Sequence, residues 1–174
     1  MKEEGSQAAT PRSLEQHCVV VSLNETLDIL WISLKAHLQS KILVFMPSRK
    51  QVRETIGGWA ILKVSFIQQV SFIFETSCKL QPGIPLLRLR GKQKQATRLA
   101  MCTRFTSTKH TVLLSTDLVA RRLDFPVVDR VLQLDAPEDA ETYTHHTGRT
   151  ARYESHGKAL LLLCPSEEEG VSSS

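Results

Sequence analysis

The sequence predicts one α/β domain whose mostly parallel sheet is covered by helices on both faces. The chain has 174 residues, which is enough to enclose one hydrophobic core. Hydrophobic residues make up 41% of it and charged residues 23%, as in folded soluble domains. Short apolar runs alternate with amphipathic segments, and this alternation is typical of βαβ units.

The strands are expected at short runs rich in apolar and β-branched residues. These runs are CVVVSL (18–23), KILVF (41–45), IPLLRL (84–89), TVLLS (111–115), VDRVLQL (128–134) and KALLLL (158–163). We expect them to be buried, as in a parallel sheet. Ligands of such sheets lie beyond the carboxyl ends of the strands, so the loops after Leu89, Ser115 and Leu134 are the candidate positions for chemistry.

Helices are expected between these strands. Asn24 is the predicted cap of the first one, Ser48 of the next, and residues 93–106 and a segment beginning near Glu138 predict two more. Apolar residues spaced three or four apart predict the face of the first helix that packs on the sheet. Those residues are Leu27, Leu30, Trp31, Leu34 and Leu38. In the 93–106 helix the residues available to the core are Leu99, Met101, Cys102 and Phe105.

The two ends of the chain are polar. We expect a flexible lead-in over residues 1–13, one folded domain over 14–168 and a flexible tail over 169–174. The start has no apolar signal region, and the segment 59–74 is too polar and too short for a confident membrane span, so no membrane partner is predicted.

Charge and cysteines narrow the function classes. A net charge of +4 suits a polyanionic partner without proving one. The cysteines lie far apart without a C-x-x-C pair, which favours reduced thiols over a zinc site, and no metal site is predicted. They are Cys18, Cys78, Cys102 and Cys164.

The segment HHTGRTAR (145–152) is the strongest candidate for chemistry. Arg149 and Arg152 are three residues apart, so on a helix both guanidinium groups project from one side. Each can donate two hydrogen bonds to phosphate oxygens, and Gly148 permits a close approach of the backbone. From spacing alone, a pair of surface arginines in weak salt bridges is the commoner arrangement.

A second candidate segment, STDLVARRLDF (115–125), follows a predicted strand. Thr116 can donate its hydroxyl to a phosphate, Asp117 can cap the following turn, and Asp124 can accept a hydrogen bond from a ribose hydroxyl. Taken singly, each of these is more often a cap or an ordinary loop residue.

A third segment, LRLRGKQKQATR (87–98), is basic. Gly91 ends a strand and exposes backbone amides, and the surrounding cationic side chains can contact a nucleic-acid backbone. These are Arg88, Arg90, Lys92, Lys94 and Arg98. A solvated helix face explains the same pattern about as well. We further expect Thr116, Asp124, Arg149 and Arg152 to meet on one exposed side of the sheet.

Taken together, the segments LVFMPSRKQV, LRLRGKQKQATR, LLSTDLVARRLDF and YTHHTGRTAR resemble the second RecA-like lobe of DEAD-box RNA helicases over residues 12–168. The resemblance implies a RecA-like three-layer α/β/α sandwich. The stretches PRSLEQHCVVVSLNETLDILW, KLQPGIPL, FPVVD and APEDAETY are similar to a nucleolar ribosome-biogenesis subgroup. That likeness implies a location in the nucleus and nucleolus, with pre-ribosomal particles as partners.

The resemblance also implies roles for single residues. Arg149 and Arg152 match arginine fingers that reach the γ-phosphate of ATP, and His145 matches the residue linking that site to the other lobe. Asp124 matches the carboxylate near the ATP ribose. Residues matching positions that hold the backbone of single-stranded or duplex RNA are Gly91, Arg98 and Thr116.

The chain departs from the family pattern at four places. Arg122 stands where the family has glycine, His146 where it has arginine, and Arg90 where it has histidine, which puts catalytic competence in doubt. Residues 54–71 have no counterpart in the family, and joining Arg53 to Phe72 restores a continuous pattern. We interpret this insertion as a retained intron or a mispredicted exon, to be tested by cloning the transcript.

The sequence contains no G-x-x-x-x-G-K-[ST] and no D-E-A-D motif. The β- and γ-phosphates of ATP and the Mg²⁺ ion would therefore be held mainly by a partner, the N-terminal lobe, and this chain alone is expected to be inactive. The alternative is a non-catalytic RecA-like module that binds RNA or protein. A Rossmann enzyme or a serine hydrolase has no supporting motif.

Overall fold

The computed structural model describes residues 13–46, 85–89, 93–116, 125–150 and 156–171. Within these ranges one sheet has the strand order β1-β6-β5-β2-β4-β3, and every neighbouring pair is parallel. The predicted parallel sheet is confirmed. The strands are β1 (Leu14–Val20), β2 (Lys41–Met46), β3 (Leu86–Arg88), β4 (Thr111–Thr116), β5 (Arg130–Gln133) and β6 (Gly157–Leu163). The helices are α1 (Leu23–Ala36), α4 (Gln95–Ser107), α6 (Ala140–Thr147) and α7 (Pro165–Val171).

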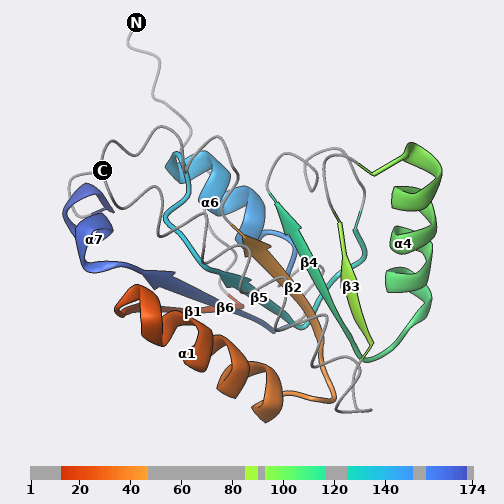
Figure 1. Ribbon diagram of the computed structural model, residues 1–174, viewed down its shortest axis with the longest axis horizontal. Helices are drawn as coiled ribbons and strands as arrows, with labels where there is room; N and C mark the ends of the chain where they lie inside the picture. Colours follow the sequence, from red (N-terminus) through yellow and green to blue (C-terminus); the bar gives the residue numbers. More distant parts are fainter. Residues whose placement is uncertain (1–12, 47–84, 90–92, 117–124, 151–155, 172–174) are drawn as a thin grey trace, which may run out of the picture.

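The sheet lies between α1 on one face and α4 and α6 on the other (Figure 1). Side chains of the central strand β2 alternate between the two faces, as a strand requires. Val44 packs in the cluster that contains Leu30 and Leu34 of α1. Phe45 packs in the cluster that contains Phe105 of α4. The predicted three-layer sandwich is therefore confirmed, with a separate apolar core on each side of the sheet.

Strand β1 differs from the buried strand that the run 18–23 predicts. It begins earlier, at Leu14, and its residues from Glu15 to Val20 are exposed. Among the strands that the structure describes it is the edge of the sheet and pairs only with β6. The apolar run predicts burial wrongly because composition does not distinguish an edge strand from a central one. Cys18 is therefore an exposed free thiol.

The first helix also begins earlier than predicted. Its N-cap is Ser22 rather than Asn24, and the Glu25 carboxylate accepts hydrogen bonds from the Ser22 N–H at 3.2 Å and hydroxyl at 2.8 Å. This reciprocal arrangement satisfies amide groups that the first helical turn cannot pair. Leu38, expected on the packed face, is 49% exposed because the helix ends at Ala36.

Two further expectations differ from the structure. Leu99 of α4 is 61% exposed, whereas Cys102 and Phe105 are buried as predicted. The helix α7 extends through Val171, past the start of the segment expected to be flexible. Its first turn is anchored where the Glu167 carboxylate accepts the Cys164 N–H at 2.9 Å. In the ranges that the structure describes, no helix is long and apolar enough to cross a bilayer.

Candidate functional site

The helix α6 positions the turn that carries Arg149. The helix begins where the Asp139 carboxylate accepts the Thr142 N–H at 2.6 Å, so the acidic start predicted near Glu138 is confirmed. It ends at Thr147, and Arg149 lies in the following turn rather than on the helix. The helical spacing that predicts Arg149 and Arg152 on one side therefore does not apply to Arg149.

Gly148 makes this turn possible by close approach of the backbone. Its N–H donates to the Thr144 carbonyl at 2.8 Å, and a Cβ atom added at Gly148 would lie 2.9 Å from that same oxygen. Real Cβ atoms do not come so close to a backbone oxygen, so any side chain would displace the turn. The expectation that Gly148 permits close approach is confirmed, and the reason is space rather than an unusual dihedral angle.

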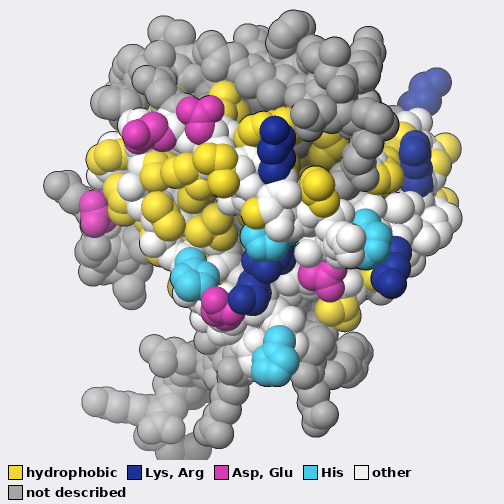
Figure 2. Space-filling model, turned by 90° about the horizontal axis from the view of Figure 1, so that it is seen from below, with side chains coloured by type: hydrophobic (Ala, Val, Ile, Leu, Met, Phe, Trp, Pro, Cys, Tyr) yellow, Lys and Arg dark blue, Asp and Glu magenta, His cyan; other side chains and the backbone are white. Residues whose placement is uncertain are grey.

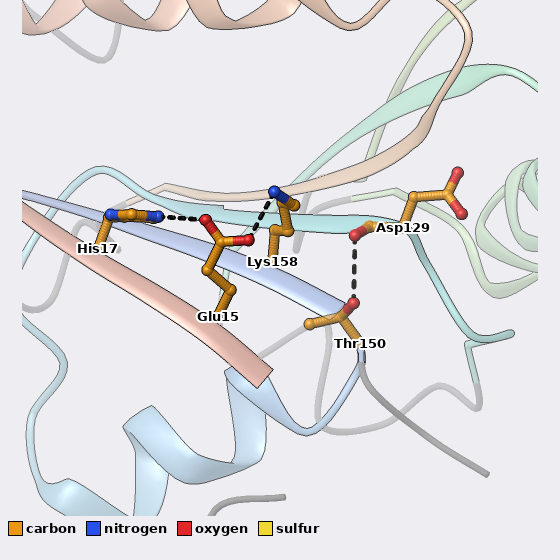
Figure 3. A network of polar contacts seen from close by, with 5 residues as sticks. All are labelled: Glu15, His17, Asp129, Thr150 and Lys158. Atoms are coloured by element: carbon orange, nitrogen blue, oxygen red, sulfur yellow. Dashed lines mark hydrogen bonds and ion pairs between the residues drawn. The ribbon is translucent and has the colours of Figure 1, made fainter. Parts of the chain in front are cut away.

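The turn is fixed to the amino end of β5. The Val128 N–H donates to the Arg149 carbonyl at 3.1 Å, and the Thr150 hydroxyl donates to the Asp129 carbonyl at 3.3 Å (Figure 3). Thr147 and Thr150 are fully buried, and Arg149 is 8% exposed. Bonds to α6 on one side and to the segment before β5 on the other therefore hold the backbone of Arg149.

Thr116 lies at the other end of the sheet. It is the last residue of β4, whereas Asp129 bonds to Lys41, which pairs with Thr111 at the start of β4. Thr111 and Thr116 are five residues apart along β4, which corresponds to about 17 Å. The expectation that Arg149 and Thr116 meet on one side at the carboxyl ends of the strands is wrong. The reason is that α6 runs back from the carboxyl end of β5 to its amino end.

Beside the candidate arginine, His146 is part of the core. Its ring stacks on Phe45 with the ring centres 3.6 Å apart and the planes 13° from parallel. Its Nδ1 lies 2.8 Å from the Gln133 Oε1, and both side chains are buried. Since an amide oxygen only accepts, Nδ1 carries the proton. His145, in contrast, is exposed.

Sequence reasoning missed the role of Gln133. A glutamine within the otherwise apolar run VLQL was the available signal, because a polar side chain there needs a buried partner. Gln133 Nε2 is buried and has no hydrogen-bond partner among the described residues.

Helix α6 is also held to β1, since the Tyr143 hydroxyl donates to Gln16 Oε1 at 2.7 Å, and burial raises the pKa of Tyr143.

The carboxyl end of the sheet carries the second group of candidate residues. Thr116 is half-buried, and its neighbour Ser115 is fully buried. Helix α4 starts at this same end of the sheet, beyond the carboxyl end of β3 (Figure 1). Arg98 lies in its first turn, where its N–H donates to the Lys94 carbonyl at 3.1 Å. The structure therefore places Thr116 and Arg98 at one end of the molecule.

Several predicted residues lie outside the described part of the chain. Of the expected site residues these are Gly91, Asp124 and Arg152. The same holds for the departures Arg90 and Arg122, for Ser48 and Asp117, and for the insertion at 54–71. What is described on either side is consistent with a folded domain, since Leu89 and Phe125 are both buried.

Comparison with known proteins identifies the family. The model for the helicase conserved C-terminal domain matches residues 22–154. ATP-dependent RNA helicase dbp4 of Aspergillus fumigatus is 51% identical over 168 residues, which are 97% of this chain and 19% of that protein. DBP4 of Gibberella zeae is 50% identical over the same shares of both chains. The chain thus spans about a fifth of the length of these relatives.

Solved structures agree with this assignment. The DEAD-box helicase domain 2 of Mss116p, bound to an RNA duplex, has a TM-score of 0.68 at 27% identity and covers 91% of this chain, which spans 57% of that one. The yeast DEAD-box splicing factor Prp28 has a TM-score of 0.73 at 18% identity, a likeness of fold alone, with 97% of this chain and 33% of that one covered. The chain therefore belongs to the helicase conserved C-terminal domain family and has the RecA-like fold of the C-terminal lobe of DEAD-box RNA helicases.

Proposed function

We propose that this chain works as the C-terminal lobe of an ATP-dependent RNA helicase. In this proposal Arg149 and Arg152 contact the γ-phosphate of an ATP molecule held between two lobes. Asp124 lies near the ribose, and His145 connects the site to the other lobe. The observation that carries the proposal is the anchored turn from Thr147 to Thr150, which holds Arg149 beside the segment that follows Asp124.

The anchored turn suits phosphoryl transfer because charge develops on the phosphate oxygens in the transition state. A guanidinium whose backbone is already fixed can stabilise that charge without a cost of reorganisation. The burial of Arg149 at 8% exposure supports this, because an electrostatic contact is stronger where water is excluded. Closure of a second lobe over this surface would complete the exclusion of water.

RNA is proposed to bind at the opposite, carboxyl end of the sheet. Thr116, Arg98 and Gly91 would contact phosphates of the RNA backbone, so binding would be independent of base sequence. The separation of this end from Arg149 supports two distinct surfaces on one lobe. The structure of Mss116p domain 2 was solved with a bound RNA duplex, which supports RNA as the class of ligand.

Mg²⁺ is not assigned to this chain. Among the residues that the structure describes, no group of three or more histidine, cysteine, aspartate or glutamate side chains could hold a metal ion. The proposal that an N-terminal lobe would hold the ion and most of the ATP rests on the lack of a P-loop motif in this sequence.

Nucleolar ribosome assembly is the proposed setting. The segments similar to the ribosome-biogenesis subgroup support it. Pre-ribosomal particles would then be the partners. Microscopy of the tagged chain would test the location, and exclusion from nucleoli would count against it.

An ATPase assay tests the proposed activity. We expect negligible ATP hydrolysis from the chain alone and RNA-stimulated hydrolysis when it is joined to the N-terminal lobe of A. fumigatus dbp4. Rapid, RNA-stimulated hydrolysis by the chain alone would contradict the division of roles. RNA binding without any hydrolysis by the joined protein would instead support the alternative of a non-catalytic binding module.

A further inference from the structure

A pocket of about 120 Å³ opens on the face of the sheet that carries α1. It lies between the second half of α1 and the strands β1, β6 and β5, and Leu132 and Leu160 form part of its lining. Polar side chains from each of these four elements also line it: His17, Ser33, His37, Arg130 and Lys158. Figure 2 looks onto this face and shows histidine and basic side chains close together beside apolar surface. Neither of the two surfaces proposed above includes this pocket.

Three charged residues stand in one row across the strands below this pocket. Lys158 on β6 pairs in register with Glu15 on β1 and with Arg130 on β5. Paired residues of neighbouring parallel strands point to the same face, so two cations, Lys158 and Arg130, are adjacent there. Like charges directly opposite one another destabilise a sheet. A bound anion would remove this repulsion.

The only carboxylate in this row is already engaged. Glu15 accepts Lys158 Nζ at 2.5 Å through one oxygen and His17 Nε2 at 2.7 Å through the other (Figure 3). These two bonds lower the pKa of Glu15 to about 2. Each oxygen of Glu15 thus already accepts one bond from a residue other than Arg130.

Arg130 is the unusual group of the pocket. Its guanidinium makes no hydrogen bond or ion pair with any other residue that the structure describes, and burial lowers its pKa although the charges of Glu15 and Asp129 act in the opposite direction. Asp129, the residue before β5, uses one carboxylate oxygen to accept the Lys41 N–H at 2.7 Å. A partly desolvated cation with unused donors favours an anionic ligand.

The histidines each leave one ring nitrogen that, in the neutral ring, carries a lone pair and no proton, so it can accept the hydroxyl proton of a hydrogen phosphate but cannot donate to its anionic oxygens. His37 donates its Nδ1 proton to the Ser33 carbonyl at 2.7 Å, so its Nε2 remains. His17 uses Nε2 on Glu15, so its Nδ1 remains. Together with Arg130 and Lys158, these groups reach the pocket from different elements.

We propose that this pocket is a binding site for a phosphate dianion, with Arg130 as the main ligand and Lys158 as the second. Cationic donors on two neighbouring strands, together with histidine acceptors, match the anionic oxygens and the hydroxyl of a hydrogen phosphate better than a planar carboxylate with two oxygens. The apolar part of the lining strengthens each charge contact by displacing water.

Titration of the isotope-labelled 174-residue chain with inorganic phosphate, followed by amide NMR at constant ionic strength, tests the proposal. We expect saturable shifts in β5, β6 and the second half of α1. Arg130→Gln should weaken binding at least about tenfold, because it removes a charged two-donor contact. Lys158→Gln should weaken it about threefold and serves as the test if Arg130→Gln does not fold.

The matched control is Arg104→Gln, which removes the same charge from the exposed surface of α4 on the other face of the sheet. It should leave phosphate binding unchanged. Dimethyl phosphate, which carries one charge and two blocked oxygens, should bind at least about tenfold more weakly than phosphate. Shifts that never saturate, equal binding of both anions, or an equal loss in Arg104→Gln would overturn the proposal.

Discussion

Arg149 and Arg98, both expected to contact phosphates, lie in different surroundings at opposite ends of the sheet. Arg149 is 8% exposed, and its backbone is bonded to α6 and to the segment before β5. Arg98 is half-buried, and its buried Nε has no hydrogen-bond partner among the described residues. A fixed turn suits a group that must be placed accurately for chemistry, whereas a side chain that can adjust suits contacts along an RNA backbone.

The largest expected difference between the two ends concerns catalysis. In the protein joined to an N-terminal lobe, Arg149→Lys should lower the ATPase rate about 10³-fold, because lysine cannot make the two-donor contact to a transferring phosphoryl group. Steady-state hydrolysis with saturating RNA measures this.

The matched variant is Arg98→Lys, which should change the rate little and raise the RNA concentration needed for stimulation a few-fold. If both variants lowered the rate equally, the comparison between a catalytic end and an RNA end would fail.

A second test asks whether the fixed turn itself matters. Gly148→Ala places a Cβ atom 2.9 Å from the Thr144 oxygen, so we expect it to destabilise the chain by about 1–3 kcal/mol. Urea unfolding measures the free energy. The control is Leu99→Ala on α4. Leu99 is 61% exposed, so removing its side chain should lower the free energy of unfolding by less than about 0.5 kcal/mol. A neutral Gly148→Ala would mean that the turn has room to move.

The core contact behind the turn should give a loss of stability of similar size. His146→Phe keeps the stacking on Phe45 but leaves the Gln133 Oε1 without this donor, which should destabilise the chain by about 1–3 kcal/mol. Adding Gln133→Leu removes the orphaned amide, so the double variant should recover about 1 kcal/mol. Additive losses in the urea-unfolding cycle would show that the His146–Gln133 bond does not contribute.

The sequence predicted the central strands well because β2 and β4 are buried on both faces and consist of continuous apolar runs. It predicted α6 because Asp139 caps it. It failed at β1, since an apolar run does not reveal that its strand lies at an edge.

The candidate site was predicted less well for a geometric reason. The residues that follow a strand are placed by the parallel-sheet rule, but those that follow a helix return to the opposite end. Thr116 is the last residue of β4 and lies at the carboxyl end as expected, whereas Arg149 follows α6 and does not. From the sequence, His146 was interpreted only as a departure from the family pattern beside the arginines. Its contacts with Phe45 and Gln133 could not be predicted, because both residues are distant from it in the sequence.

A substitution on the exposed edge strand β1 should change the stability of the chain least, in contrast to one in the buried turn. The pKa of Glu15 is lowered from 4.5 to about 2 by its bonds to Lys158 and His17. Because the folded-state pKa is the lower one, the contribution to stability is present above pH 4.5 and is lost as the pH falls toward 2.

Urea midpoints should therefore separate the parent from Glu15→Gln at neutral pH and converge across this window. Glu138→Gln, at an exposed site before α6, removes the same charge and should show no such convergence. A constant gap between the parent and Glu15→Gln down to pH 2 would mean that solvent screens the Glu15 bonds completely.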